Sequence, residues 1–208
     1  MPLPPQNNPV GRLVLRVIVL LPLFFFIWYV MAPVLIWPLA LLANWVLPLW
    51  FPEVIAEVVR SGEGLDVVTQ LPLPPGALAQ MPPGAIGELV FTVDPLIYCY
   101  NLPLFTALAI AVPGEEGAKW RTWSWGLPWL FMAQVWGVGF DTLKTLLFGI
   151  GPEAPRLVGF SAWQTEVVAL GYQLGFLILP SVLPIAIWFV LHRDYLASLV
   201  RDQRGTPV

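Results

Sequence analysis

The chain has 208 residues, of which 58% are hydrophobic and 11% are charged, and it contains eleven tryptophans. So much apolar surface cannot be hidden in one small water-soluble core, so the composition predicts an integral membrane protein. The formal net charge of −3 excludes the strongly basic surface that attracts nucleic acid. A single cysteine excludes an intramolecular disulfide and any multi-cysteine metal motif.

The first predicted element is a retained transmembrane helix. Arg12 and Arg16 precede an apolar run that is too long for a signal peptide and lacks a small-residue cleavage pattern. The 36 residues between Arg16 and Glu53 carry no formal charge, whereas one crossing needs about 20 residues. Two interpretations follow: a tight hairpin of two crossings, or one crossing near 13–37 that continues as a helix along or above the far interface.

Charge favours the single crossing. A hairpin would return residues 53–94 to the side of the N-terminal arginines, yet Arg60 is the one basic residue of that segment, against six acidic ones. Cytoplasmic segments show the opposite bias. Glu53 and Glu57 lie one turn apart on the expected helix extension, and we interpret them as a solvated acidic face rather than a metal site.

Residues 61–94 predict a small extracytoplasmic β-hairpin. The stretches LDVVTQL and ELVFTVD alternate in hydropathy and are separated by a connection rich in proline and glycine. Two isolated strands are marginally stable in water, so they must pack on the helices or on another protein. An exposed strand edge can bind an extended peptide through main-chain hydrogen bonds. The candidate partner-binding residues are Val67, Val68, Thr69, Val90, Phe91 and Thr92.

Three more crossings are predicted in the remaining chain, at about 95–113, from about 123 into QVWGVGFDTLKTLLF, and at about 167–191. The predicted fold is therefore a mainly α integral membrane protein with four transmembrane helices, an extracytoplasmic helix extension and a small β-hairpin. We divide it into an N-terminal transmembrane helix with its extension (1–60), the extracytoplasmic β-hairpin (61–94), and a three-helix transmembrane region with a cytoplasmic tail (95–208). Three basic residues would lie outside (Arg60, Lys144 and Arg156), and seven would lie inside: Arg12, Arg16, Lys119, Arg121, Arg193, Arg201 and Arg204. This bias predicts that both termini are cytoplasmic.

The topology separates the single cysteine from the single histidine. Cys99 falls at the outer end of the second crossing and His192 at the inner end of the fourth, a hydrocarbon thickness of roughly 30 Å apart. A thiolate–imidazole pair needs hydrogen-bond contact, so the two cannot form a catalytic dyad within one chain. We interpret Cys99 as a packing residue and His192 as an interfacial anchor. No catalytic, metal or cofactor motif is recognisable.

Polar residues and glycines recur at helical spacings in the third and fourth crossings. Polar residues at such depth either pair structurally, which we favour, or line a cavity or proton path. The GxxxG match in LGYQLGF, together with Gly137 and Gly139, predicts close packing between the two helices. The candidate packing and intramembrane polar residues are Gln134, Gly137, Asp141, Lys144, Glu166, Gly171, Gln173 and Gly175.

Several ordered blocks resemble the exosortase H-associated membrane protein family of bacteria. They are APVLIWPLALLANW, GELVFTVDPLIYCYNLPL, QVWGVGFDTLKTL, WQTEVVALGYQLGFLILP and the terminal LHRDYL. The resemblance implies an accessory component found with exosortase H, a membrane transpeptidase that processes proteins bearing a C-terminal sorting segment. It does not define this protein's own molecular activity.

The preferred hypothesis is a non-catalytic accessory protein of the bacterial inner membrane that binds exosortase H or presents its substrate. A second is a small transporter or proton-linked channel that uses the polar residues Gln134, Asp141, Lys144, Glu166 and Gln173. A third is a thiol enzyme in which Cys99 uses a base from another chain. The chain is not expected to be the transpeptidase, which would need cysteine, arginine and histidine together on the outer face.

Overall fold

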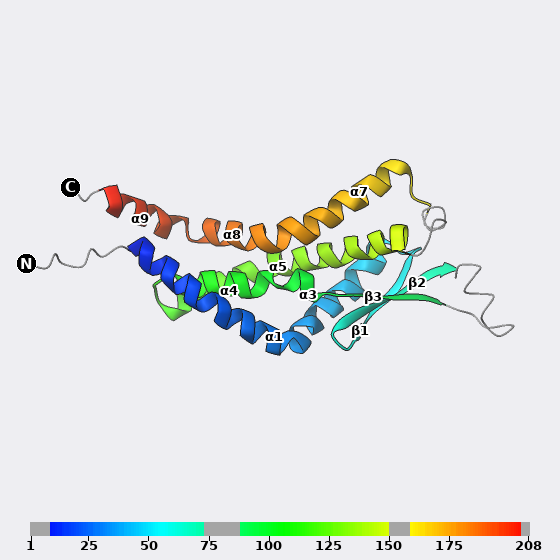
Figure 1. Ribbon diagram of the computed structural model, residues 1–208, viewed down its shortest axis with the longest axis horizontal. Coiled ribbons are helices and arrows are strands. Elements are labelled where there is room, and N and C mark those ends of the chain that lie inside the picture. The colour runs from blue at the N-terminus through cyan, green and yellow to red at the C-terminus, as the bar shows by residue number, and fades with distance from the viewer. Residues whose placement is uncertain (1–8, 73–87, 150–158, 205–208) are drawn as a thin grey trace, which may run out of the picture. The chain divides into compact units, whose positions relative to one another are not determined.

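The computed structural model describes residues 9–72, 88–149 and 159–204 (Figure 1). The fold is mainly helical, with a small antiparallel sheet. The predicted connection rich in proline and glycine falls largely outside the described residues, as does Arg156. In chain order the elements are α1 (Pro9–Trp50), β1 (Ile55–Ser61), β2 (Gly64–Pro72), β3 (Glu88–Val93), α3 (Leu96–Cys99), α4 (Asn101–Ala111), α5 (Glu116–Lys144), the π-helical turn η1 (Thr145–Gly149), α7 (Ala162–Gln173), the π-helical turn η2 (Leu174–Ile178), α8 (Leu179–Leu191) and α9 (Arg193–Arg204).

The chain forms two compact units. The terminal unit contains both chain ends and comprises Met1–Val30, Tyr100–Leu130 and Ser181–Val208. The sheet unit comprises Met31–Cys99 and Phe131–Pro180. Helices α1, α5 and α8 each contribute residues to both units, so a unit is assembled from segments that are far apart in the sequence.

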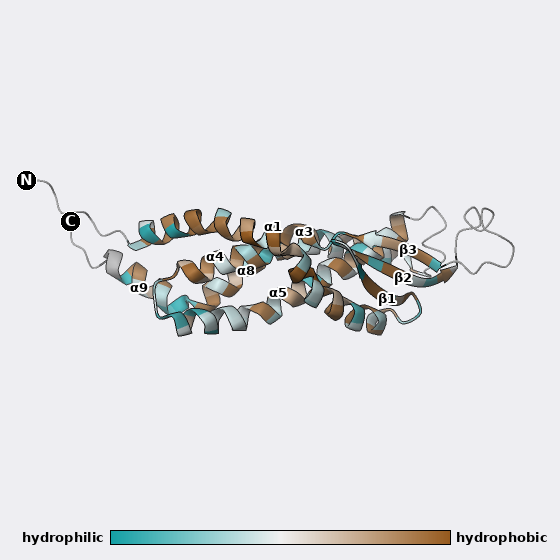
Figure 2. Ribbon diagram, turned by 90° about the horizontal axis from the view of Figure 1, so that it is seen from below, coloured by the Kyte–Doolittle hydropathy of each residue, from teal (hydrophilic) through white to brown (hydrophobic). Residues whose placement is uncertain are grey.

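Two helical stretches of the described residues are long and apolar enough to cross a membrane. They are Pro9–Trp50 and Ala162–Leu191, and few of their side chains are buried within the protein. Figure 2 shows apolar residues along α1 and α8, with hydrophilic ones at the start of α1. The stretch Leu96–Ala111 is apolar but shorter, and α5 includes charged residues at both ends. The four-crossing arrangement therefore stays a prediction.

The sheet has three strands in the order β1-β2-β3, where a hairpin of two was predicted. The predicted helix extension reached residue 60, but the helix ends at Trp50 and β1 follows. Gly62 adopts a φ of +62°, which permits the tight turn that pairs Ser61 with Gly64. Glu57 consequently lies on a strand, so the prediction of an acidic helix face is wrong.

The sheet has one buried face. Alternate side chains of a strand point to opposite sides, and the partners Val58 and Val67 are both buried, as are Leu65 and Val93. On the other face, Val90 is 48% exposed. A sheet with one buried face has a fixed register, because a slip of one residue would bring polar side chains into the core.

The terminal unit is built around the contact between α4 and the first half of α5. Phe105 is fully buried and its ring lies against Gly126, where no side chain could be accommodated without movement. The buried Asn101 donates a hydrogen bond from Nδ2 to the carbonyl oxygen of Leu130 at 3.2 Å. This bond satisfies a polar group that would be costly to bury alone.

Within the sheet unit, glycines let α5 approach the α7–η2 segment. An added Cβ at Gly175 would lie 3.1 Å from the Cα of Gly137. The ring of Phe140 occupies the space beside Gly171 and stacks on Trp136, with 4.6 Å between ring centroids. Trp136 also donates from Nε1 to the Gly171 carbonyl oxygen at 3.1 Å. The glycines of the GxxxG match thus make the close helix contact themselves.

The Gly171→Ala substitution is expected to lower stability by about 1–3 kcal/mol, because the new methyl group would overlap the Phe140 ring. The loss would occur even though alanine favours a helix more than glycine does. Gly117→Ala is the matched control, since nothing lies within 4 Å of that position. Melting temperatures in detergent measure both, and equal values for the two variants would contradict this packing.

Candidate functional site

The candidate partner-binding residues divide between a central strand and an edge strand. Val67, Val68 and Thr69 lie on β2, which pairs with β1 on one side and with β3 on the other. Val67 and Thr69 are also buried, at 0% and 2% exposure. The backbone of β2 therefore has no free edge for an added peptide. The sequence did not reveal this, because β1 was predicted to be helical.

Helix α1 covers the middle of the β1 edge. The Val58 N–H donates to the side-chain oxygen Oδ1 of Asn44 at 2.9 Å. In an antiparallel ladder, the backbone groups of alternate residues point away from the neighbouring strand. The bond from Val58 shows that this residue is one of those that point away from β2. An unpaired edge invites unwanted pairing, and Asn44 occupies it here.

The outer edge of β3 has no such cover among the described residues. Val67 pairs with Phe91, and Val68 pairs with Val90. Val58 is the partner of Val67, so the backbone groups of Val67 also point away from β1, that is, toward Phe91. The backbone groups of Phe91 therefore point toward β2, and those of its neighbours Val90 and Thr92 point outward. No other described strand pairs with β3. This outer edge, which we call the β3 edge, can add an extended segment.

A polar cluster lies in the sheet unit and is centred on Asp141. Lys144 donates from Nζ to the Asp141 carboxylate at 3.2 Å, and its ammonium group lies 4.6 Å from the centroid of the Tyr172 ring. The buried hydroxyl of Tyr98 lies near the same carboxylate but forms no hydrogen bond within the described part of the chain. We call these four residues the Asp141 cluster. They join α3, α5 and α7.

The local sequence explains why Tyr98 packs close to Asp141. Gly137 precedes Asp141 by one helical turn, and the Tyr98 ring fills the space where a side chain would be. Tyr98 belongs to α3, which follows β3 almost directly, and the Asp94 carboxylate accepts a hydrogen bond from the Leu96 N–H at 2.9 Å. The Asp141 cluster therefore fixes the chain just beyond the end of β3.

The other intramembrane polar candidates do not meet at this cluster. Gln134 is fully buried on α5, but Glu166 and Gln173 are exposed. A helical repeat places Glu166 and Gln173 on the opposite side of the α7–η2 segment from the buried Val168 and Gly175. The polar residues of the transporter hypothesis thus do not line one path within the sheet unit.

Cys99 and His192 belong to different units. Cys99 is fully buried as a free thiol, whereas a reactive cysteine needs partial exposure. His192 follows the stretch Ala162–Leu191, and its Nδ1 lies 3.1 Å from the Trp188 carbonyl oxygen. Burial lowers the pKa of the imidazole, and the hydrogen bond to Trp188 opposes that shift. In the described ranges, no three His, Cys, Asp or Glu side chains gather to hold a metal ion.

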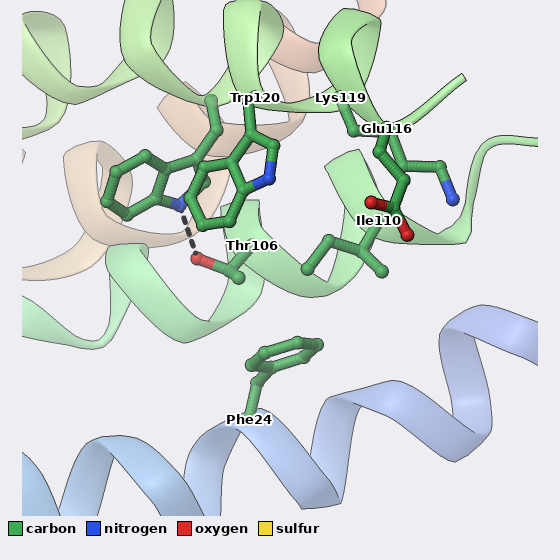
Figure 3. A pocket seen from close by; sticks show the side chains of 7 residues that line it. Phe24, Thr106, Ile110, Glu116, Lys119 and Trp120 are labelled. Atoms are coloured by element: carbon green, nitrogen blue, oxygen red, sulfur yellow. Dashed lines mark hydrogen bonds between the residues drawn. The ribbon is translucent and has the colours of Figure 1, made fainter. Parts of the chain in front are cut away.

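The terminal unit holds a cavity of about 430 Å³ between α1, α4 and α5, which the sequence did not predict. Figure 3 shows Phe24 facing Thr106 and Ile110 across it, with Glu116 and Lys119 at one end. Trp123 donates from Nε1 to the Thr106 hydroxyl at 3.0 Å. Its mostly aromatic and aliphatic lining suits an apolar chain, and its size is within the range of small-molecule sites.

Comparison with known protein families assigns the chain to one family. The sequence pattern of a family described as exosortase H-associated membrane protein matches residues 7–195. The chain belongs to this family. The family resemblance predicted from the sequence blocks is thereby confirmed, and the match spans the β3 edge, the Asp141 cluster and the cavity of Figure 3. No curated protein and no solved structure matches this exosortase H-associated membrane protein.

Unequal exposure within the Asp141 cluster gives a prediction. The Asp141 side chain is 11% exposed and the Lys144 side chain 39%. Lys144→Met should cost about 1–3 kcal/mol, because it leaves a buried carboxylate without its cation. Asp141→Asn should cost less than about 1 kcal/mol, because Lys144 can then reach solvent. Melting temperatures in detergent test the order, and a larger loss for Asp141→Asn would contradict it.

Proposed function

We propose that this exosortase H-associated membrane protein is a non-catalytic accessory protein that binds exosortase H, or presents its substrate, through the β3 edge. The observation that carries the proposal is the difference between the two edges of the sheet. One edge is covered by Asn44, and the other directs the backbone groups of Val90 and Thr92 outward. A strand that leaves an edge unpaired can bind an extended peptide.

The surroundings of the β3 edge support recognition of a peptide. Main-chain hydrogen bonds would supply affinity, and the exposed side chains of Val90 and Thr92 would supply selectivity. The Thr92 hydroxyl donates to the Asp66 carboxylate at 2.6 Å, which holds the edge strand to β2. The edge is also pre-organised, because the Asp141 cluster fixes α3 just beyond it. Pre-organisation lowers the ordering cost of binding.

The distribution of charge supports a proposed orientation in the bacterial inner membrane. Nine of the thirteen acidic residues fall within the sequence ranges of the sheet unit, together with three basic ones. All seven basic residues that the sequence analysis placed inside fall within the ranges of the terminal unit. We therefore assign the sheet to the extracytoplasmic side and both termini to the cytoplasm, in a multi-pass arrangement with four crossings.

Single cysteines in a Cys99→Ala background test this orientation. Glu63 lies in the exposed turn between β1 and β2, and Ala197 is exposed on α9. Glu63→Cys should react with a membrane-impermeant maleimide on intact spheroplasts. Ala197→Cys should react only after lysis. The reverse pattern would refute the orientation, whatever the partner proves to be.

A proline at Val90 tests the β3 edge. Proline lacks a backbone N–H, and the Val90 N–H points away from β2, so the ladder within the sheet stays intact. Val90→Pro should reduce the exosortase H recovered by co-purification from detergent about fivefold, which corresponds to one hydrogen bond of about 1 kcal/mol.

Arg60→Pro is the matched control, because Arg60 occupies the corresponding outward position on β1. Its recovery of exosortase H should equal that of the unaltered protein. If both variants recover equal amounts of exosortase H and have unchanged melting temperatures, the proposal that the β3 edge binds the sortase is wrong. A substrate-presenting role would instead appear as loss of a co-purified sorting-segment peptide with Val90→Pro.

A further inference from the structure

The terminal unit has a second, smaller cavity with a different chemistry from the one in Figure 3. It measures about 120 Å³ and lies between the start of α1, the α4–α5 connection and α9. Its lining comprises Pro9, Arg12, Leu13, Arg16, Pro113 and Tyr195. Two arginines and a tyrosine therefore line one small cavity.

The two arginines carry unbalanced positive charge. Arg12 and Arg16 lie four residues apart on α1, so their side chains project from the same side of the helix and repel one another. Neither forms an ion pair with any carboxylate of the described residues, where the pairs are Lys144 with Asp141 and Arg193 with Asp194. A bound anion would remove the repulsion.

The position of the cavity indicates which kind of anion could bind there. Around Arg16 and in the turns that follow it, the other exposed residues of α1 are apolar, with Val14, Leu15 and Ile18 at least half exposed. Helix α9, which contributes Tyr195, has a polar composition with leucine and valine on one side, as in helices that lie in the membrane interface. Lipid phosphates lie at the boundary between apolar and polar surface.

We propose that this cavity binds the phosphate group of an anionic phospholipid. Arg12 and Arg16 would each present paired N–H donors to the phosphate oxygens, a geometry that lysine does not reproduce. The Tyr195 hydroxyl would donate a further hydrogen bond. Basic pockets between membrane helices on the cytoplasmic side bind such head groups. A lipid held here would join α1 to α9.

Native mass spectrometry of the full chain in detergent tests the site. Cardiolipin and phosphatidylglycerol should remain bound in preference to phosphatidylcholine. Arg12→Gln/Arg16→Gln should weaken binding about tenfold or more, because charge-assisted hydrogen bonds are lost. Arg12→Lys/Arg16→Lys should retain part of the affinity, and Tyr195→Phe should weaken it without any change in net charge.

The matched control is Arg193→Gln/Arg201→Gln, which removes the same charge from exposed positions of α9 outside the cavity. It should leave lipid binding unchanged. Equal loss in both double variants would overturn the site in favour of diffuse attraction. Inorganic phosphate serves as the competing probe, and displacement of the lipid by millimolar phosphate would overturn the lipid as the ligand. An unchanged melting temperature in each variant excludes unfolding as the cause.

Discussion

The sheet unit depends on one carboxylate placed where a helix would otherwise be apolar. Asp141 is almost buried, and it is paired with Lys144 on its own helix, while the Tyr98 ring from α3 packs against Gly137 one turn earlier. A buried charge without a partner is destabilising by several kcal/mol, so Lys144 must stay beside Asp141. Because Tyr172 lies beneath the Lys144 ammonium group, α7 is held to the same point.

The sheet is attached to the helices at both of its outer strands, β3 and β1. The segment that packs Tyr98 against Gly137 of α5 begins right after β3, so the end of this strand is tied to α5. On the opposite side, Asn44 ties the β1 backbone to α1. A three-stranded sheet is small, and these two attachments replace the neighbours it lacks. They also make its edges unequal, and the proposed partner site follows from that inequality.

The two units differ in chemistry as well as in composition. The sequence ranges of the sheet unit contain most of the acidic residues, whereas the terminal unit has arginines at the start of α1 and on α9. One set of features suits the binding of an extended peptide, and the other suits anionic lipid. The proposed peptide and lipid sites are built from different residues, so each can be tested while the other is left intact.

The sequence by itself determined the membrane character, the mainly helical fold, strands β2 and β3, and the glycines that let α5 approach the α7–η2 segment. These are properties of composition, of hydropathy alternation and of missing side chains, which local pattern expresses directly. It did not reveal β1, because Pro52 after the end of α1 resembles the prolines that this helix contains without ending, and the strand character of IAEVVRS depends on pairing with β2. Tertiary structure alone decided which strand edge Asn44 covers, that Tyr98 packs against Gly137 near Asp141, and that Arg12 and Arg16 share a cavity with Tyr195. Those contacts join residues that are 14 to more than 180 positions apart in the sequence. A pattern within a short stretch cannot predict contacts over such sequence separations.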